Sequence, residues 1–163
     1  MKAKKGITLI ELIIAMAISV AILAVLVMAY VAGSKLFNSE MSRSAAFLEA
    51  NKAVSTLRSD LRSCLELTSA NATGISFWAD DLNSNGTREA NEIYSYSWNG
   101  TAGSPLTRTI SGSSTMIAKD IKNFLLTYNS GTLASITQVD IKVTAGTAEN
   151  AATFESSVKL RNL

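Results

Sequence analysis

A run of 24 residues with a single formally charged side chain constrains this chain more than any other feature of its sequence. Between Ile7 and Tyr30 that charge belongs to Glu11, and nearly all the other side chains are apolar or small. A helix of this length spans about 36 Å, which exceeds the roughly 30 Å hydrocarbon core of a bilayer. We therefore predict a membrane-spanning helix over residues 7–30.

Three lysines precede this run, at Lys2, Lys4 and Lys5, with no acidic residue among them. Basic flanks stay on the cytoplasmic side of a membrane, so we expect a cytoplasmic amino terminus and an exported chain after Tyr30. The sequence thus predicts a single-pass protein of the cytoplasmic (inner) membrane with its carboxy terminus outside.

The bulk composition argues against several classes of function. The 163 residues suffice for one folded domain plus the helix, and the formal charge is only +2, so no direct nucleic-acid binding is predicted. Histidine is absent, which removes the commonest general base and zinc ligand, and no serine has an imidazole to activate it. We predict that the chain is not an enzyme.

An amphipathic pattern continues beyond the apolar run. Apolar residues recur on one helical face while serine, arginine, glutamate and asparagine fill the other, so we predict a helical continuation over residues 31–67. The stripe comprises Phe47, Ala50, Val54, Leu57, Leu61 and Cys64. The lone Cys64 excludes an intramolecular disulfide, and we interpret it as a buried apolar residue rather than a reactive thiol.

Residues 68–163 have the composition of an exported β-rich domain. Short β-prone runs are separated by turn signals, which favours antiparallel hairpin connections, whereas 116–123 is expected to be a short helix or a bridging turn. The expected strands are 74–79, 93–98, 106–110, 124–128, 138–144 and 154–160, and the turns are Asn85-Gly86, Asn99-Gly100, Ser111-Gly112 and Ser130-Gly131. The predicted fold class is α+β, with a long amino-terminal helix packed on a small antiparallel sheet.

The amino terminus carries the most specific motif. Lys4-Lys5-Gly6 is followed by an apolar helix with Glu11 at its fifth position. This pattern resembles the leader of bacterial type IV prepilins and type II secretion pseudopilins. The resemblance implies that a prepilin peptidase cuts between Gly6 and Ile7 and that Ile7 is then N-methylated. Loss of residues 1–6 would leave 12 basic and 13 acidic side chains.

Glu11 needs a reason to lie in an apolar run, because a charged side chain costs up to about 3 kcal/mol near the centre of a membrane helix. By the resemblance, it pairs with the amino-terminal ammonium of a neighbouring subunit, so that processing creates the partner needed for assembly. The alternative from the residues themselves is a glutamate that reaches toward the headgroups.

Two other interpretations of the amino terminus stay open. Ala15-Met16-Ala17 has the form of a signal peptidase site, but cleavage there would leave the apolar residues 18–30 on a secreted protein. A plain membrane anchor is the second.

The chain departs from the family pattern at two positions. Ile7 stands where phenylalanine is usual, and Met28 stands where major pilins often have a kinking proline. Together with the missing cysteine pair, this favours a minor pilin or a pseudopilin over a major subunit, and Glu11 argues against the tip-most pseudopilin. The expected partners are other pilin or pseudopilin subunits, prepilin peptidase, an inner-membrane assembly platform and the lipid bilayer. A membrane-anchored, calcium-dependent adhesion module is the alternative from another class.

Residues 81–92 satisfy the twelve-residue calcium-loop pattern, with oxygen ligands at alternate positions, glycine at the sixth and glutamate at the twelfth. The candidate ligands are Asp81, Asn83, Asn85, Thr87 (through its carbonyl), Glu89 and Glu92. β-like runs flank this loop, so we predict a weak calcium site in a sheet connection rather than an EF-hand sensor. A polar turn that needs no ion is the alternative.

Tyr94, Tyr96 and Trp98 alternate with small residues and are expected on one face of a strand. An aromatic row can bind a partner or a sugar. We favour the simpler interpretation, in which the row covers the core face of the sheet.

Overall fold

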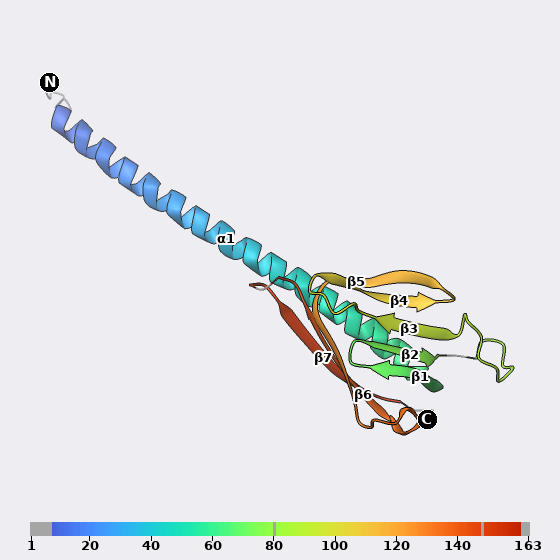
Figure 1. The fold of residues 1–163 in the computed structure, drawn as a ribbon. Coiled ribbons are helices and arrows are strands. Elements are labelled where there is room, and N and C mark those ends of the chain that lie inside the picture. Colours follow the sequence, from blue (N-terminus) through green and yellow to red (C-terminus); the bar gives the residue numbers. More distant parts are fainter. Residues whose placement is uncertain (1–7, 80, 148, 161–163) are drawn as a thin grey trace. The chain divides into compact units, whose positions relative to one another are not determined.

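The computed structural model describes residues 8–79, 81–147 and 149–160. The chain divides into two compact units, Met1–Glu40 and Met41–Leu163. Helix α1 (Leu9–Arg62) contributes to both units (Figure 1). The leader and Ile7 lie outside the described residues.

The first unit contains the apolar part of α1. Its large apolar side chains are exposed, with 77% of Leu9 and 66% of Val25 accessible. The helix is long and apolar enough to cross a membrane. Because water-exposed apolar surface on this scale is unfavourable, this part of α1 requires an apolar environment such as lipid.

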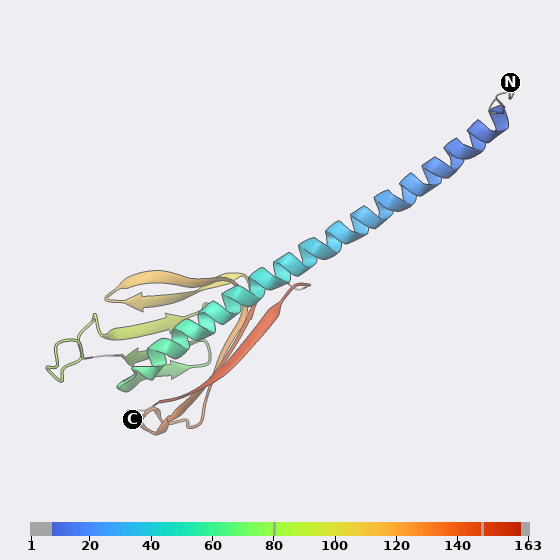
Figure 2. The same cartoon turned by 180° about the vertical axis from the view of Figure 1, so that it is seen from behind.

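The second unit combines the end of α1 with one seven-stranded sheet (Figure 2). Each strand pairs antiparallel with the next strand along the chain, which confirms the α+β class and the predicted meander. The strands are β1 (Glu66–Asn71), β2 (Gly74–Trp78), β3 (Ile93–Ser97), β4 (Ser104–Ile110), β5 (Ser113–Tyr128), β6 (Gln138–Ala145) and β7 (Ala152–Lys159), with a 3₁₀ turn at Leu133–Ser135. All four predicted turn signals fall between consecutive strands. Ser111 and Gly112 both have positive φ, at 51° and 76°, as a two-residue hairpin requires.

The sheet packs on one face of α1, and the two share a single apolar core. The buried helix residues follow helical spacing and are joined in the core by Cys64, Phe77 and Phe124. The buried residues of α1 are Ala46, Ala50, Ala53, Val54, Leu57 and Leu61, and all but Ala46 belong to the shared core cluster. Cys64 is fully buried, as expected, whereas Phe47 is 44% exposed and meets Phe154 edge to face at the rim of the core.

The predicted helical range 31–67 is wrong at its end. α1 stops at Arg62, and Glu66 and Leu67 belong to β1, which the sequence analysis did not predict. Backbone bonds from Ser63 to Asp60 and from Cys64 to Leu61 tighten the last turn. The Leu65 N–H then bonds to the carbonyl of Trp78 (2.8 Å), so pairing with β2 overrides the helical pattern.

The expected helix or turn at 116–123 is also wrong, because these residues lie within β5. The apolar spacing there, Ile117, Ala118 and Ile121, is not alternating, since the strand changes face at Asp120, which has a φ of 53°. Register shifts in the pairing of β5 with both β4 and β6 accompany this change. Glu49 of α1 accepts a hydrogen bond from the Lys119 N–H (3.0 Å), which fixes the irregular backbone to the helix.

A polar cluster joins the end of α1 to the middle of the sheet. Asp60 Oδ2 accepts hydrogen bonds from the hydroxyl of Tyr96 on β3 (2.5 Å) and from Nη1 of Arg108 on β4 (3.0 Å). The Arg108 guanidinium also lies 5.6 Å from the centre of the Tyr94 ring. The cluster therefore fixes which residues of the sheet face the last turns of the helix.

Candidate functional site

Thr8 and Glu11 form the amino-terminal cap of α1. The backbone N–H and the hydroxyl of Thr8 donate to Glu11 Oε2, at 2.8 and 3.0 Å, and the Glu11 N–H donates to Thr8 Oγ1 at 3.4 Å. The Thr8 carbonyl accepts the first helical bond, from Leu12. This reciprocal arrangement is a capping box. The spacing Thr-x-x-Glu at the start of an apolar run was the signal for it, and the sequence analysis missed it.

The capping box satisfies hydrogen bonds of Glu11 without neutralising its charge. Both donors come from Thr8 and are uncharged, and both bind the same carboxylate oxygen. Neighbouring side chains such as Leu12 and Ile14 are apolar and exposed. Thr8 already supplies the hydrogen bonds of the Glu11 carboxylate and its helix-capping role. Pairing with a cation would stabilise the charge of this carboxylate further.

The two predicted processing residues, Gly6 and Ile7, lie outside the described residues. The structure therefore places only the third member of the predicted amino-terminal site, Glu11, on the first turn of α1.

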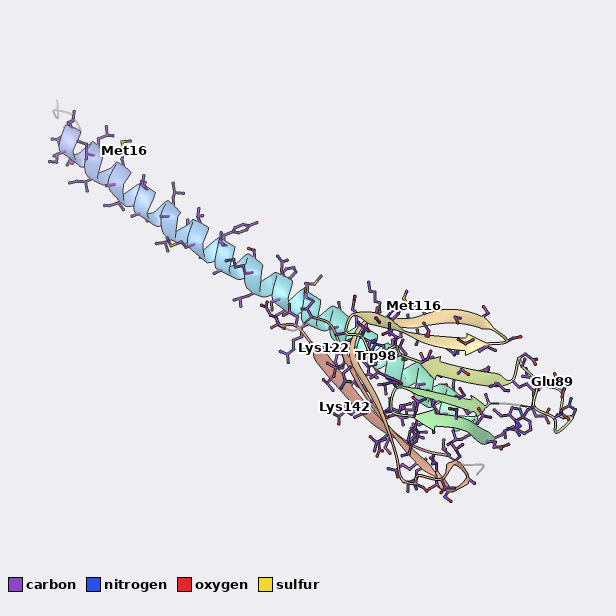
Figure 3. All side chains as sticks on the ribbon, in the orientation of Figure 1. Met16, Glu89, Trp98, Met116, Lys122 and Lys142 are labelled. Carbon is purple, nitrogen blue, oxygen red and sulfur yellow. The ribbon has the colours of Figure 1, made fainter. Side chains whose placement is uncertain are left out.

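The predicted calcium loop connects β2 to β3 and extends beyond the ends of these strands; Glu89 marks it in Figure 3. Asp81 accepts the backbone N–H groups of Asn85 (3.1 Å) and Gly86 (2.7 Å), and Gly86 has a φ of 70°. The side-chain nitrogens of Asn83 and Asn85 both donate to Glu89 Oε1, at 2.9 and 3.1 Å. Four candidate ligands, Asp81, Asn83, Asn85 and Glu89, are thus brought together.

The remaining two candidates have other roles in this conformation. The Thr87 N–H donates to Asn85 Oδ1 at 2.7 Å. Glu92 is 1% exposed, and its oxygens accept the Leu82 N–H (2.8 Å), the Trp78 indole N–H (3.1 Å) and the Glu89 N–H (3.2 Å). The bond from Trp78 attaches Glu92 to β2, and the other two bonds close the base of the loop.

The donor set fits a hard cation only with asparagine oxygens included. Within the described parts of the chain, no three carboxylates, thiols or imidazoles gather closely enough to form a metal site by themselves. Asp81, Asn83, Asn85 and the Thr87 carbonyl are oxygen donors of the type calcium takes, and Glu92 would ligate only by sharing its three hydrogen bonds.

The aromatic row of β3 belongs to the core. Tyr96 is 1% exposed, Trp98 is 8% exposed and Tyr94 packs against the same cluster. The Tyr96 ring stacks on Phe77 with centres 6.3 Å apart. This confirms the simpler interpretation of the row.

Sequence reasoning did not single out the polar contacts between helix and sheet. Asp60 and Arg108 are 48 positions apart, and Glu49 and Lys119 are 70 apart. Each residue looks like an ordinary exposed polar residue in its own segment, and only the fold brings the partners together.

Residues 1–30 match the family model of the prokaryotic N-terminal methylation motif. No curated protein and no solved structure significantly matches the chain.

Proposed function

We propose, from the premise that this chain fits a type IV pilin-like protein, that it is a minor pilin-type structural subunit of a pilus or pilus-like filament. The observation that carries the proposal is the methylation motif over residues 1–30, which includes an apolar helical segment, residues 9–30, with Glu11 as its one charged side chain. In this role, prepilin peptidase removes residues 1–6, Ile7 is methylated, and α1 joins the helices of sister subunits.

The exposed apolar surface of α1 supports both stages of this role. Before assembly, residues up to Tyr30 hold the chain in the cytoplasmic membrane in a single pass, and the lysines of the leader keep the amino terminus inside. After assembly, neighbouring helices replace the lipid. The sheet is then displayed outside the membrane.

The cation that pairs with Glu11 is the amino-terminal ammonium of a neighbouring subunit, which exists only after cleavage. The contacts of Glu11 leave room for this pairing, because Oε2 carries both bonds from Thr8 and its other carboxylate oxygen is not needed for the cap. Cleavage and assembly are coupled in this way.

Mass spectrometry of the chain recovered from membranes tests the processing step. In a host with prepilin peptidase, we expect a mature chain that begins at Ile7 and carries one added methyl group. A chain that still begins at Met1 in such a host contradicts the proposal.

A type II secretion pseudopilin is the second candidate, since the same amino-terminal motif serves both systems by the resemblance. Deletion of the chain separates the two. Loss of surface filaments with normal protein export supports the minor pilin, and loss of export supports the pseudopilin.

The loop between β2 and β3 is proposed to bind calcium weakly, through Asp81, Asn83, Asn85 and Glu89, with the Thr87 carbonyl as a further oxygen donor. The gathering of oxygen donors around the tight turn at Gly86 supports this. Two of these ligands are neutral asparagines, so the expected affinity is in the roughly 10⁻⁴–10⁻³ M range of extracellular sites.

A further inference from the structure

Among the residues that the structure describes, the last strand of the sheet has a free hydrogen-bonding edge. β7 pairs with β6, and β7 ends the strand order. The Leu160 N–H bonds to the Thr137 carbonyl (2.9 Å). Because every second residue of an antiparallel strand bonds to its neighbour, this bond shows which residues of β7 face β6. Even-numbered residues of β7 therefore bond to β6. The N–H and C=O groups of Thr153, Glu155, Ser157 and Lys159 point away from it.

A basic groove adjoins β7 in the second unit. It has a volume of about 310 Å³ and lies between α1 and Phe154 of β7. The polar part of the helix wall is formed by Asn51, Ser55, Arg58, Ser59 and Arg62, which follow each other at helical spacing, and all but the half-buried Asn51 are exposed.

The side chains that line this groove carry only positive charge. Its lining contains two arginines and no carboxylate. Arg58 and Arg62 are both exposed, and neither forms an ion pair with another part of the chain that the structure describes. A ligand with negative charge is favoured here over a neutral or basic one.

The edge and the groove match one kind of ligand geometrically. A strand added to β7 would lie about 4.8 Å from it and continue the sheet along the helix wall. Alternate side chains on such a strand are about 6.7 Å apart, close to the roughly 6 Å rise between Arg58 and Arg62, one helical turn apart. Two acidic side chains two residues apart could therefore meet both arginines.

We propose that β7 and the Arg58–Arg62 face of α1 bind, by strand addition, an extended segment of another protein with acidic side chains at alternate positions. A second copy of this chain is a poor match, because no two of its own acidic residues are two positions apart. Backbone bonds to the edge of β7 provide the attachment, and the arginines select the sequence. This binding does not depend on the proposed filament role.

A peptide-binding experiment on the full chain in detergent tests the charge selection. The probe is a fluorescently labelled eight-residue peptide that alternates glutamate with valine, and the comparison peptide alternates lysine with valine. We expect the acidic peptide to bind at least tenfold more tightly. Arg58→Glu combined with Arg62→Glu should weaken its binding at least tenfold, whereas the matched pair Arg43→Glu with Lys52→Glu, outside the groove, should change it less than twofold.

Three results would overturn the proposal. They are equal binding of the two peptides, no binding of the acidic peptide at 1 mM (about the weakest useful affinity), and equal effects of the two double variants. Melting temperatures show whether the variants fold. If the double variant Arg58→Glu with Arg62→Glu does not fold, Arg58→Gln with Arg62→Gln replaces it under the same criteria.

Amide hydrogen exchange tests the strand addition itself. On binding the acidic peptide, the amides of Thr153, Glu155, Ser157 and Lys159 should become protected, while those of the even-numbered residues, already bonded to β6, should not change. Ser157→Pro, which removes an edge donor, should abolish this protection. Peptide binding without the alternating protection overturns strand addition, and the same protection at high protein concentration without peptide indicates a second copy and overturns the proposed partner.

Discussion

Asp60 is the residue on which most of the polar attachment between helix and sheet depends. Its Oδ2 atom serves Tyr96 and Arg108 together, and the Asp60 and Arg108 side chains are only 16% and 27% exposed. Burial, followed by the hydrogen bond to Asp60, raises the pKa of the Tyr96 phenol, so this hydroxyl remains a donor at any physiological pH.

Replacing Asp60 with alanine should lower the free energy of unfolding by about 2 kcal/mol, because a partly buried guanidinium and a buried hydroxyl lose their acceptor. Urea denaturation of the full chain in detergent measures this. Glu155→Ala, which removes the exposed ion pair with Lys142, is the matched control and should cost less than about 0.5 kcal/mol. Equal losses in the two variants would show that the Asp60 cluster contributes no more than a surface pair.

Cys64 should make the stability of the second unit fall at alkaline pH. Burial raises the pKa of its thiol from 9.0 to about 12. Because folding favours the protonated thiol, this contribution to stability is complete below about pH 9 and is lost as the pH rises toward 12. Denaturation between pH 8 and 11 should show the decline, and Cys64→Ala should make it shallower. An identical pH profile for the variant would contradict the buried thiol.

At the scale of elements, the sequence predicted best where pattern and packing agree. The amphipathic stripe of α1 between Ala50 and Leu61 and the alternating strand β3 appear as expected, since their periodicity matches the surface they bury. The sequence could not predict β1, which contains one buried residue, Leu67, and depends on pairing with β2. The long strand β5 was not predicted as one strand, because its buried residues stop alternating where the strand changes face at Asp120.

Gly146 shows how closely the turn after β6 approaches the helix. It has a φ of 96°, and a Cβ atom added there would lie 2.7 Å from the Cβ of Ala46. Gly146→Ala should therefore destabilise the second unit by about 2 kcal/mol, through overpacking and backbone strain.

Thermal unfolding checks this prediction against Gly131→Ala. Gly131 has no atom within 4 Å of the position of an added Cβ and no positive φ. The Gly131→Ala control should have a melting temperature close to that of the wild type. A Gly146→Ala protein with the wild-type melting temperature would contradict the close approach of Gly146 to Ala46.

Calcium should raise the melting temperature of the full chain if the loop between β2 and β3 binds it. At millimolar calcium we expect a rise of a few degrees, because a ligand that binds only the folded state stabilises it. Asp81→Ala should abolish the rise, while Asp140→Ala, on the outer face of β6, should preserve it. If calcium does not change the melting temperature of the wild type, the polar-turn alternative is favoured, in which the asparagine side chains only form hydrogen bonds to the backbone.

At the scale of the whole molecule, the amino-terminal motif and the folded unit carry different kinds of information. The motif predicted the pilin-like class from Gly6, Ile7 and Glu11, because these residues lie close together in the sequence and need no tertiary contact to be recognised. The contacts of Asp60 and Glu49 could not be predicted, because they join residues that only the curled sheet brings together.

The capping box also changes how the role of Glu11 must be tested. Glu11→Ala removes both a charge and part of the helix cap, whereas Thr8→Ala removes the hydroxyl of the cap and keeps the carboxylate. Helix caps contribute about 1 kcal/mol, which the long α1 can tolerate. The two variants therefore separate assembly from helix stability.

Filament yield of these two variants, measured by electron microscopy in a host with prepilin peptidase and the assembly platform, is the most direct test of an assembly role for Glu11. We expect Glu11→Ala to remain in the membrane without entering filaments, and Thr8→Ala to assemble at close to the wild-type level. Normal incorporation of Glu11→Ala, or an equal loss in both variants, would contradict pairing of the Glu11 carboxylate with a neighbouring subunit.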